Sequence, residues 1–146
     1  MSSQFIVDNQ GVGLHPTLTL SVDTTADKDF TQTDLDAGRT ACVISDNNEA
    51  GMGSAGDKLF GKVVAVSTEL DANGIPATCT VQARGVARIK YNTSAAPAVN
   101  QMVEADGAGK VRQASAVADI PAGGHPHRGI VIAKDTTNET IDVWLG

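Results

Sequence analysis

The sequence predicts an all-β protein: a small β-sandwich or barrel with long loops and an N-terminal arm. Three observations predict this class. Apolar and polar residues alternate with a period of two in short runs, which is the pattern of half-buried strands. Glycine, asparagine and aspartate separate these runs, and these residue types favour turns. No long stretch combines a helical period with capping residues at its ends.

The predicted strands follow one another along most of the chain. The run around Val63 and Val64 is apolar at successive positions, so we expect a strand that is buried on both faces. Gly85 interrupts a continuous alternation and predicts a bulge or bend between two halves of one long strand. Asp106 to Gly109 predicts the turn of a hairpin, because glycine supplies the positive φ that a tight turn needs. The predicted strands are 14–22, 40–45, 60–68, 77–83, 87–91, 101–105, 110–113, 129–134 and 140–145.

The chain of 146 residues has the length of one domain. We expect a possible arm over residues 1–13 and a single β domain over residues 14–146. Two stretches, 23–38 and 45–57, read as long loops, and loops of this length in compact domains are usually functional. Within the first of them, Thr33 to Ala37 predicts one short helical turn that starts at Thr33.

Composition excludes several classes of function. The net charge of −6 opposes nucleic-acid binding, which depends on Lys and Arg contacts with phosphates. Aromatic residues make up only 3% of the chain, so the core consists mainly of Ala and Val and would gain from burial against a partner or against other copies of the chain. We expect no membrane span, because no apolar run reaches the required length, and no signal peptide at the N-terminus.

Candidate chemical sites each have a simpler structural interpretation. Residues 106–110 lack the first Gly and the final Ser or Thr of a phosphate loop, which leaves a hairpin turn. Residues 69–74 resemble the first half of a calcium loop, but position twelve is Thr80 and the flanks read as strands. His125 and His127 have a spacing compatible with metal binding, without a further ligand cluster nearby.

We therefore predict no metal, no cofactor and no enzymatic activity. Nucleophilic catalysis would need a Ser or Cys, a His and a carboxylate that converge in space, and no local signature of such a site is present. Cys42 and Cys79, the only cysteines, lie in apolar strand-like runs. We interpret them as buried free thiols, although a disulfide between them stays open at this point.

The second half of the chain, from Phe60 onward, resembles the capsid cement, or decoration, proteins of tailed bacteriophages. In that family a Gly-Val strand is followed by a G-D-x-V segment or its equivalent, a hairpin with a D-x-x-G-x-V pattern, a G-x-A strand and a short final strand. Gln101 and Met102 stand in this chain where a Gly-Asp pair often lies. The segments that carry the resemblance are Val81–Ile89, Val99–Gly107, Gly109–Val111, Arg128–Ala133 and Ile141–Leu145.

The resemblance implies a protein that binds the outside of an expanded icosahedral capsid and clamps neighbouring major capsid subunits. It also implies synthesis in the host cytoplasm, location on the virion exterior and a homo-oligomer, with a trimer favoured. Phe5, Ile6 and Val7 of the arm are candidate capsid contacts, unless this segment is simply the first strand of the domain. Met52 in the second long loop is another candidate.

The alternative function is a receptor- or glycan-binding β-module of a phage tail or cell surface. The scarcity of aromatic side chains argues against the stacking on which sugar binding usually relies.

Overall fold

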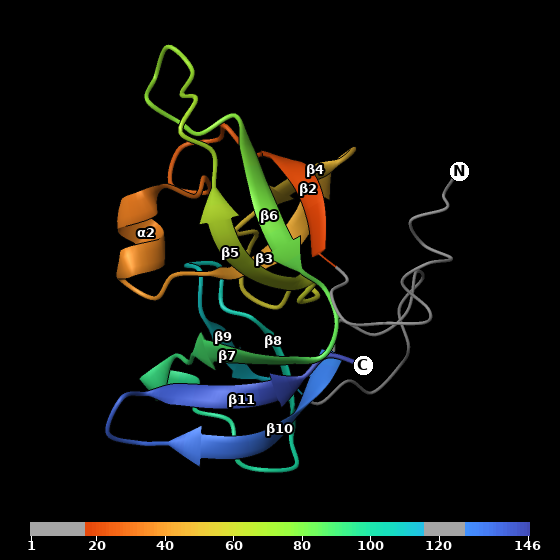
Figure 1. Cartoon of the computed structure of the whole chain (residues 1–146). Helices are drawn as coiled ribbons and strands as arrows, with labels where there is room; N and C mark the ends of the chain where they lie inside the picture. Colours follow the sequence, from red (N-terminus) through yellow and green to blue (C-terminus); the bar gives the residue numbers. More distant parts are fainter. Residues whose placement is uncertain (1–16, 116–127) are drawn as a thin grey trace, which may run out of the picture.

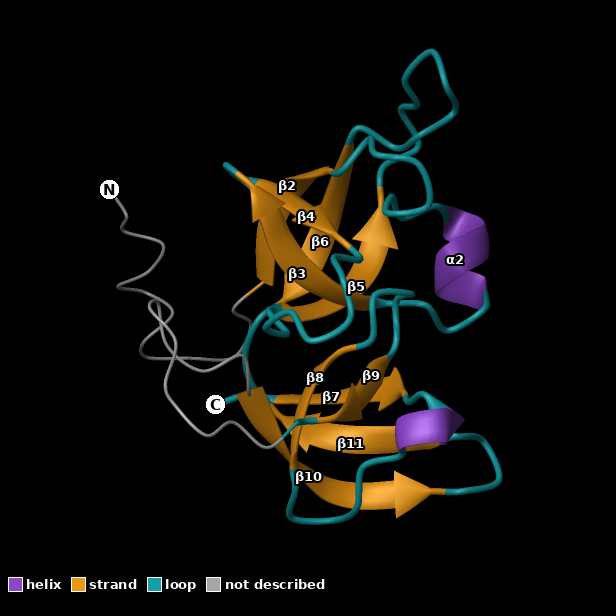
Figure 2. Ribbon diagram, turned by 180° about the vertical axis from the view of Figure 1, so that it is seen from behind, coloured by secondary structure: helices purple, strands orange, loops and turns teal. Residues whose placement is uncertain are grey.

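The computed structural model describes residues 17–115 and 128–146 and confirms the all-β class. It contains a closed five-stranded barrel and a separate five-stranded sheet, which lies below the barrel in Figure 1 and Figure 2. The barrel strands, in spatial order, are β2 (Thr17–Val22), β4 (Glu49–Gly51), β3 (Ala41–Asp46), β5 (Gly61–Val66) and β6 (Thr78–Gln82). The sheet strands are β7 (Val86–Lys90), β11 (Thr140–Trp144), β10 (Arg128–Asp135), β8 (Met102–Ala105) and β9 (Val111–Gln113).

Alternation correctly predicts which residues of most strands face the interior. In β6, Cys79 and Val81 are buried, whereas the threonines between and beside them are partly exposed. In β7, Ala87 and Ile89 are buried and Arg88 is exposed. The predicted hairpin is also present, because β8 pairs antiparallel with β9, and β10 pairs antiparallel with β11 as well.

The stretch 45–57, predicted to be a loop, contains a strand. β4 occupies Glu49–Gly51 and pairs antiparallel with β3 and parallel with β2, so it closes the barrel. A tight turn precedes it, and Asn48 has a positive φ of 56° there. Three residues, one of them glycine, are too few for a detectable alternation, and only pairing on both sides defines this strand.

The prediction that the strand around Val63 is buried on both faces is wrong. β5 buries Val63 completely, but Val64 is 45% exposed. Closure of the barrel explains the difference. A small closed barrel has one interior, so only alternate residues of each strand contribute to it.

The prediction that Gly85 lies between two halves of one long strand is wrong. The two halves are β6 of the barrel and β7 of the second sheet, and Gly85 connects them with a φ of +78°. Its carbonyl accepts the backbone N–H of Leu145 at 2.7 Å, which ties the connection to the end of the chain. The glycine therefore lets the chain pass from one sheet to the other.

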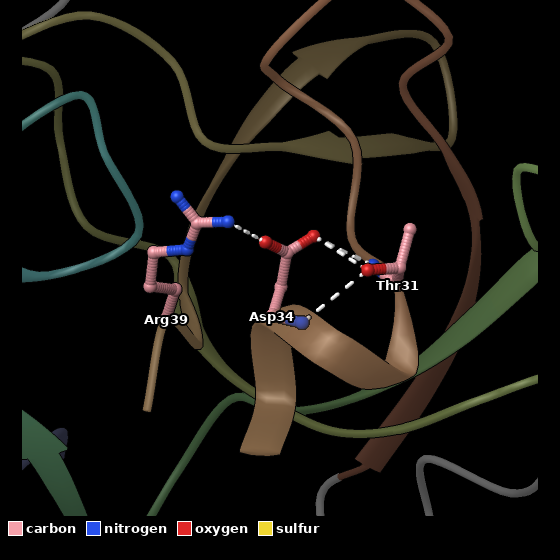
Figure 3. A network of polar contacts seen from close by, with 3 residues as sticks. All are labelled: Thr31, Asp34 and Arg39. Carbon is pink, nitrogen blue, oxygen red and sulfur yellow. Dashed lines mark hydrogen bonds and ion pairs between the residues drawn. The ribbon is translucent and has the colours of Figure 1, made fainter. Parts of the chain in front are cut away.

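The helix α2 (Gln32–Asp36) begins earlier than predicted, because Thr31 rather than Thr33 caps it. The Thr31 hydroxyl accepts the backbone N–H of Asp34, and the Asp34 carboxylate accepts the backbone N–H of Thr31. Figure 3 shows this reciprocal capping box, with the guanidinium of Arg39 on the other oxygen of Asp34. The other helical segment is the single 3-10 turn η1 (Thr93–Ala95).

Each sheet surrounds its own apolar cluster. The barrel cluster includes Phe30, which is fully buried although it lies in the first predicted loop. The cluster of the second sheet also includes Ala41 and Leu59, which come from the barrel half of the chain. The two cores are therefore joined by side chains that the barrel segment contributes to the sheet.

Candidate interaction surface

An apolar row crosses the outer face of the second sheet. It consists of Met102 on β8, Ile130 on β10, Trp144 on β11 and Val86 on β7. Direct register places each residue opposite the next: Met102 opposite Ile130, Ile130 opposite Trp144, and Trp144 opposite Val86. Paired residues of neighbouring strands point to the same face, and three strand spacings amount to about 14 Å. We call these four residues the apolar row.

The apolar row is accessible to solvent. The exposed fraction is 42% for Met102, 50% for Trp144 and 51% for Val86, and Ile130 is partly buried. The inward residues beside them, such as Val143 and Val103, are fully buried in the core. Single exposed apolar residues are normal on a protein surface, whereas large contiguous apolar patches occur at protein contact surfaces and ligand-binding grooves.

A glycine bulge aligns β10 with this row. Arg128 lies opposite Val103, which faces the core, whereas Ile130 lies opposite the exposed Met102. Gly129 between them has a φ of +77°, and the register shifts at this point. The bulge thus directs Arg128 toward the barrel and Ile130 toward the outer face.

A polar row borders the apolar one on the same face. Arg88 and Asp142 lie directly opposite each other and form a bidentate ion pair, with Nε–Oδ1 at 2.7 Å and Nη2–Oδ2 at 3.0 Å. The hydrogen bond from Arg88 holds the pKa of Asp142 below its usual value. Apolar residues beside a solvated polar rim are the arrangement found in protein–protein contact surfaces.

A cleft of about 620 Å³ opens on another part of the molecule, between β3, the segment before β5, and the start of β10. Val43, Ile44, Leu59 and Phe60 form its apolar lining, with Asp57, Lys58 and Arg128 as the charged members. The guanidinium of Arg128 donates to the backbone carbonyls of Phe60 and Ala83, both in the barrel half of the chain. The cleft therefore lies where the barrel meets the second sheet.

Met52 does not fit its predicted role as a capsid contact. Only 3% of its surface is exposed, and its side chain belongs to the barrel core. Met52 directly follows strand β4, which closes the barrel, and this position places its side chain in the barrel core. Phe5, Ile6 and Val7 lie outside the described residues and stay a prediction.

Turn chemistry explains two of the candidate ligand sites. The Asp71 carboxylate accepts the backbone N–H groups of Asn73 and Ile75, at 2.8 and 2.9 Å, so it stabilises the turn at Gly74. Asp106 does the same for Ala108 and Lys110 in the β8–β9 hairpin. Among residues 17–115 and 128–146, no group of three or more His, Cys, Asp or Glu is placed to hold a metal ion. His125 and His127 lie outside these ranges.

The two cysteines are buried free thiols in the barrel core, as one of the two interpretations predicted. Burial raises the pKa of Cys42 to about 12 and that of Cys79 to about 11. Thiols with such pKa values are protonated and unreactive at neutral pH. Both cysteines therefore act as small apolar side chains of the core.

Sequence reasoning missed the apolar row, although a signal for it was present. Val86 is in phase with Arg88 and Lys90, and Trp144 is in phase with Asp142. Large apolar side chains thus occupy positions that alternation assigns to the solvent-facing side. Their lateral alignment depends on the register between strands, which is decided by pairing and not by the local pattern.

Comparison with known proteins gave no match to a family model, a curated protein or a solved structure. Neither helix in the described part of the chain has the length and hydrophobicity that a membrane crossing requires.

Proposed function

We propose that this protein is a decoration protein of a tailed-bacteriophage capsid, which binds the outer surface of the expanded head and clamps neighbouring major capsid proteins. The observation that carries the proposal is the apolar row, which offers Met102, Trp144 and Val86 to a protein partner. The sequence resemblance of the chain from Phe60 onward supports the choice of a capsid as that partner. The proposal includes no catalytic step, cofactor or nucleic-acid contact.

The proposed mechanism is thermodynamic linkage. A protein that binds only the assembled, expanded lattice stabilises that state by its differential binding free energy. Many copies act on one shell, so a modest affinity for each contact adds up to resistance against internal pressure. The protein would be made in the host cytoplasm and would be located on the exterior of the virion.

A homotrimer is the proposed oligomeric state. The described cores contain mostly Val and Ala, with Phe30, Leu59, Ile89 and Ile141 among the few large side chains that are fully buried. Contact between copies would add buried apolar surface to these small cores. Light scattering measures this state directly.

Cosedimentation with expanded capsids that lack decoration protein tests the function. We expect the wild-type protein to pellet with the capsids, and the double variant Met102→Ser/Trp144→Ser to bind more weakly. A central aromatic residue of an interface contributes about 2 kcal/mol or more, so the Kd should rise at least about 30-fold. Val64→Ser is the matched control, because Val64 is similarly exposed but lies on the barrel.

The possible outcomes distinguish whether the protein binds a capsid from whether the apolar row is the surface that binds it. If the wild-type protein binds no lattice state, the capsid proposal is wrong. Binding of the double variant at wild-type affinity would instead exclude the apolar row as the contact surface. Saturable binding to a glycan array that is lost with Trp144→Ser would support the alternative, a glycan-binding module.

A further inference from the structure

The chain contains a single Asn-Gly step, Asn73-Gly74, and the structure places it at the surface. The step lies in the connection between β5 and β6, which projects beyond the barrel in Figure 1. Residues 68–74 are all exposed to solvent. Gly74 has a φ of +79°, and no described residue other than its chain neighbours lies within 4 Å of the position that a Cβ would occupy. Water therefore has free access to both residues.

An asparagine that precedes glycine can react with its own main chain. The Gly74 nitrogen gives its proton to water and attacks Cγ of Asn73, so an N–Cγ bond forms, the Cγ–Nδ2 bond breaks and ammonia leaves. Glycine favours this step because it has no Cβ beside the attacking nitrogen and a wide range of backbone angles. Water then opens the imide ring: cleavage at Cγ gives aspartate, and cleavage at the main-chain carbonyl gives isoaspartate. The reaction consumes water, releases ammonia and requires no redox partner.

The turn holds Asn73 by its main chain and leaves its reactive side chain free. The backbone N–H of Asn73 donates to the Asp71 carboxylate at 2.8 Å, but no described residue forms a hydrogen bond with the Asn73 side-chain amide. The carboxylate also accepts the N–H of Ile75 at 2.9 Å, and the Gly74 N–H donates to the Asp71 carbonyl at 3.0 Å. These bonds must open before the Gly74 nitrogen can attack. Asp71 therefore slows the reaction, although exposed turns open at a low free-energy cost.

The β8–β9 turn contains the corresponding Asp-Gly step, Asp106-Gly107, in a packed environment. Aspartate before glycine can form the same imide with loss of water, but both carboxylate oxygens of Asp106 are engaged here. Oδ1 accepts the backbone N–H of Ala108 at 2.7 Å, and Oδ2 accepts the side-chain amide of Asn92 at 3.3 Å. A Cβ on Gly107 would lie only 2.8 Å from the backbone nitrogen of Ala55. The structure thus separates two steps that are chemically similar in the sequence.

We propose that Asn73 is a modification site, at which the native protein deamidates spontaneously to aspartate and isoaspartate, and that the Asp71 turn controls the rate. The product carries a new carboxylate two positions from Asp71. Isoaspartate also adds a methylene group to the main chain of this loop, close to Leu70, which is 56% exposed. The modification changes the charge and the shape of the loop with the age of the protein, and it goes beyond the proposed function.

Incubation of the full-length protein under native conditions at pH 8 tests the proposal. After digestion at mildly acidic pH, mass spectrometry should show that the peptide with Asn73 converts at least several times faster than any other asparagine peptide. Electron-transfer fragmentation should identify isoaspartate at this position. Isoaspartyl methyltransferase with labelled S-adenosylmethionine should label the same peptide and leave the Asp106-Gly107 peptide unlabelled.

Four variants test the roles of the individual residues. Asn73→Gln and Gly74→Ala should both abolish the modification at position 73, since the first requires a larger ring and the second places a methyl group beside the attacking nitrogen. Asp71→Ala should speed deamidation of Asn73 several-fold, because two backbone N–H groups lose their acceptor. Asp135→Ala is the matched control, because Asp135 accepts the N–H groups of Thr137 and Asn138 in a different exposed turn. Its rate at Asn73 should equal that of the wild type.

A synthetic peptide of residues 69–77 provides the reference without the fold. If Asn73 of the protein stays intact for the time in which this peptide converts completely, the folded turn protects the site and the proposal is wrong. Equal rates for the wild type and Asp71→Ala would overturn the control of the rate by Asp71. Labelling of Asp106-Gly107 as fast as of Asn73-Gly74 would show that the local structure does not select the site. None of these results depends on capsid binding.

Discussion

Two ion pairs of the second sheet show how burial changes the value of one interaction. The Glu104 carboxylate is 1% exposed and accepts from Arg112 Nε at 2.7 Å and from the Ser115 hydroxyl at 3.1 Å. The Arg88–Asp142 pair has similar distances but lies at the surface, where 69% of the Arg88 side chain is exposed. A buried carboxylate requires its partners, whereas water can replace the partner of an exposed one.

Removal of the arginine should therefore have unequal effects on stability. Arg112→Met leaves the Glu104 carboxylate buried without its cation, and should lower the free energy of unfolding by about 3–5 kcal/mol. Arg88→Met, the matched control, should cost far less, because Asp142 regains hydration. Urea denaturation of both variants measures the difference. If both variants lose the same free energy of unfolding, burial of Glu104 does not make its ion pair more important than the exposed one.

At the scale of elements, the β8–β9 hairpin turn joins the sheet to the barrel. The Gly109 carbonyl accepts the backbone N–H groups of Thr40 and Ala41, both at 2.8 Å, and Lys28 Nζ donates to the Gly107 carbonyl at 3.0 Å. These glycines have φ values of +84° and +87°. A motif that superficially suggests a phosphate loop thus serves as the contact between two sheets.

Substitution of these glycines separates backbone strain from steric contact. Gly74→Ala should cost about 1–2 kcal/mol, because its φ is positive but nothing lies within 4 Å of the added Cβ. Gly109→Ala should cost about 1–3 kcal/mol more, since the Cβ would lie 2.7 Å from Arg39 Cβ and 3.0 Å from its Cα. Denaturation midpoints give both values. If Gly109→Ala loses no more stability than Gly74→Ala, the residues around Gly109 can move enough to accommodate the extra methyl group.

At the scale of the whole molecule, the question is whether the barrel and the second sheet unfold together. Each has its own apolar cluster, but Ala41 and Leu59 extend the sheet's cluster into the barrel half of the chain. Arg128 and the hairpin turn at Gly109 add hydrogen bonds across the same junction. The prediction of one β domain over residues 14–146 requires this junction to couple the two parts.

We expect one cooperative transition in urea. Trp144, the only tryptophan, reports on the sheet by fluorescence, and the reactivity of Cys42 and Cys79 toward a thiol reagent at pH 8 reports on the barrel. The native thiols should be unreactive, because burial excludes the reagent and raises their pKa values to about 12 and about 11. Ser45→Cys supplies an exposed thiol as the control. Two separate midpoints would show that barrel and sheet unfold independently.

The sequence alone was sufficient for the features that arise from local energetics. Alternation predicted the inward residues of β6 and β7, and turn residues predicted the β8–β9 hairpin. It also predicted that Cys42 and Cys79 are buried. Each of these depends on neighbours within a few residues, where backbone preference and side-chain polarity act together.

Only the tertiary structure decided the features that depend on pairing between distant segments. β4 exists because β2 and β3 bind it on both sides, and its closure of the barrel buries Met52 and exposes Val64. The apolar row exists because register aligns residues from four strands, of which only β10 and β11 are consecutive in the chain. A strand's pattern specifies which side chains share a face, but the neighbouring strand and its register determine which of them meet.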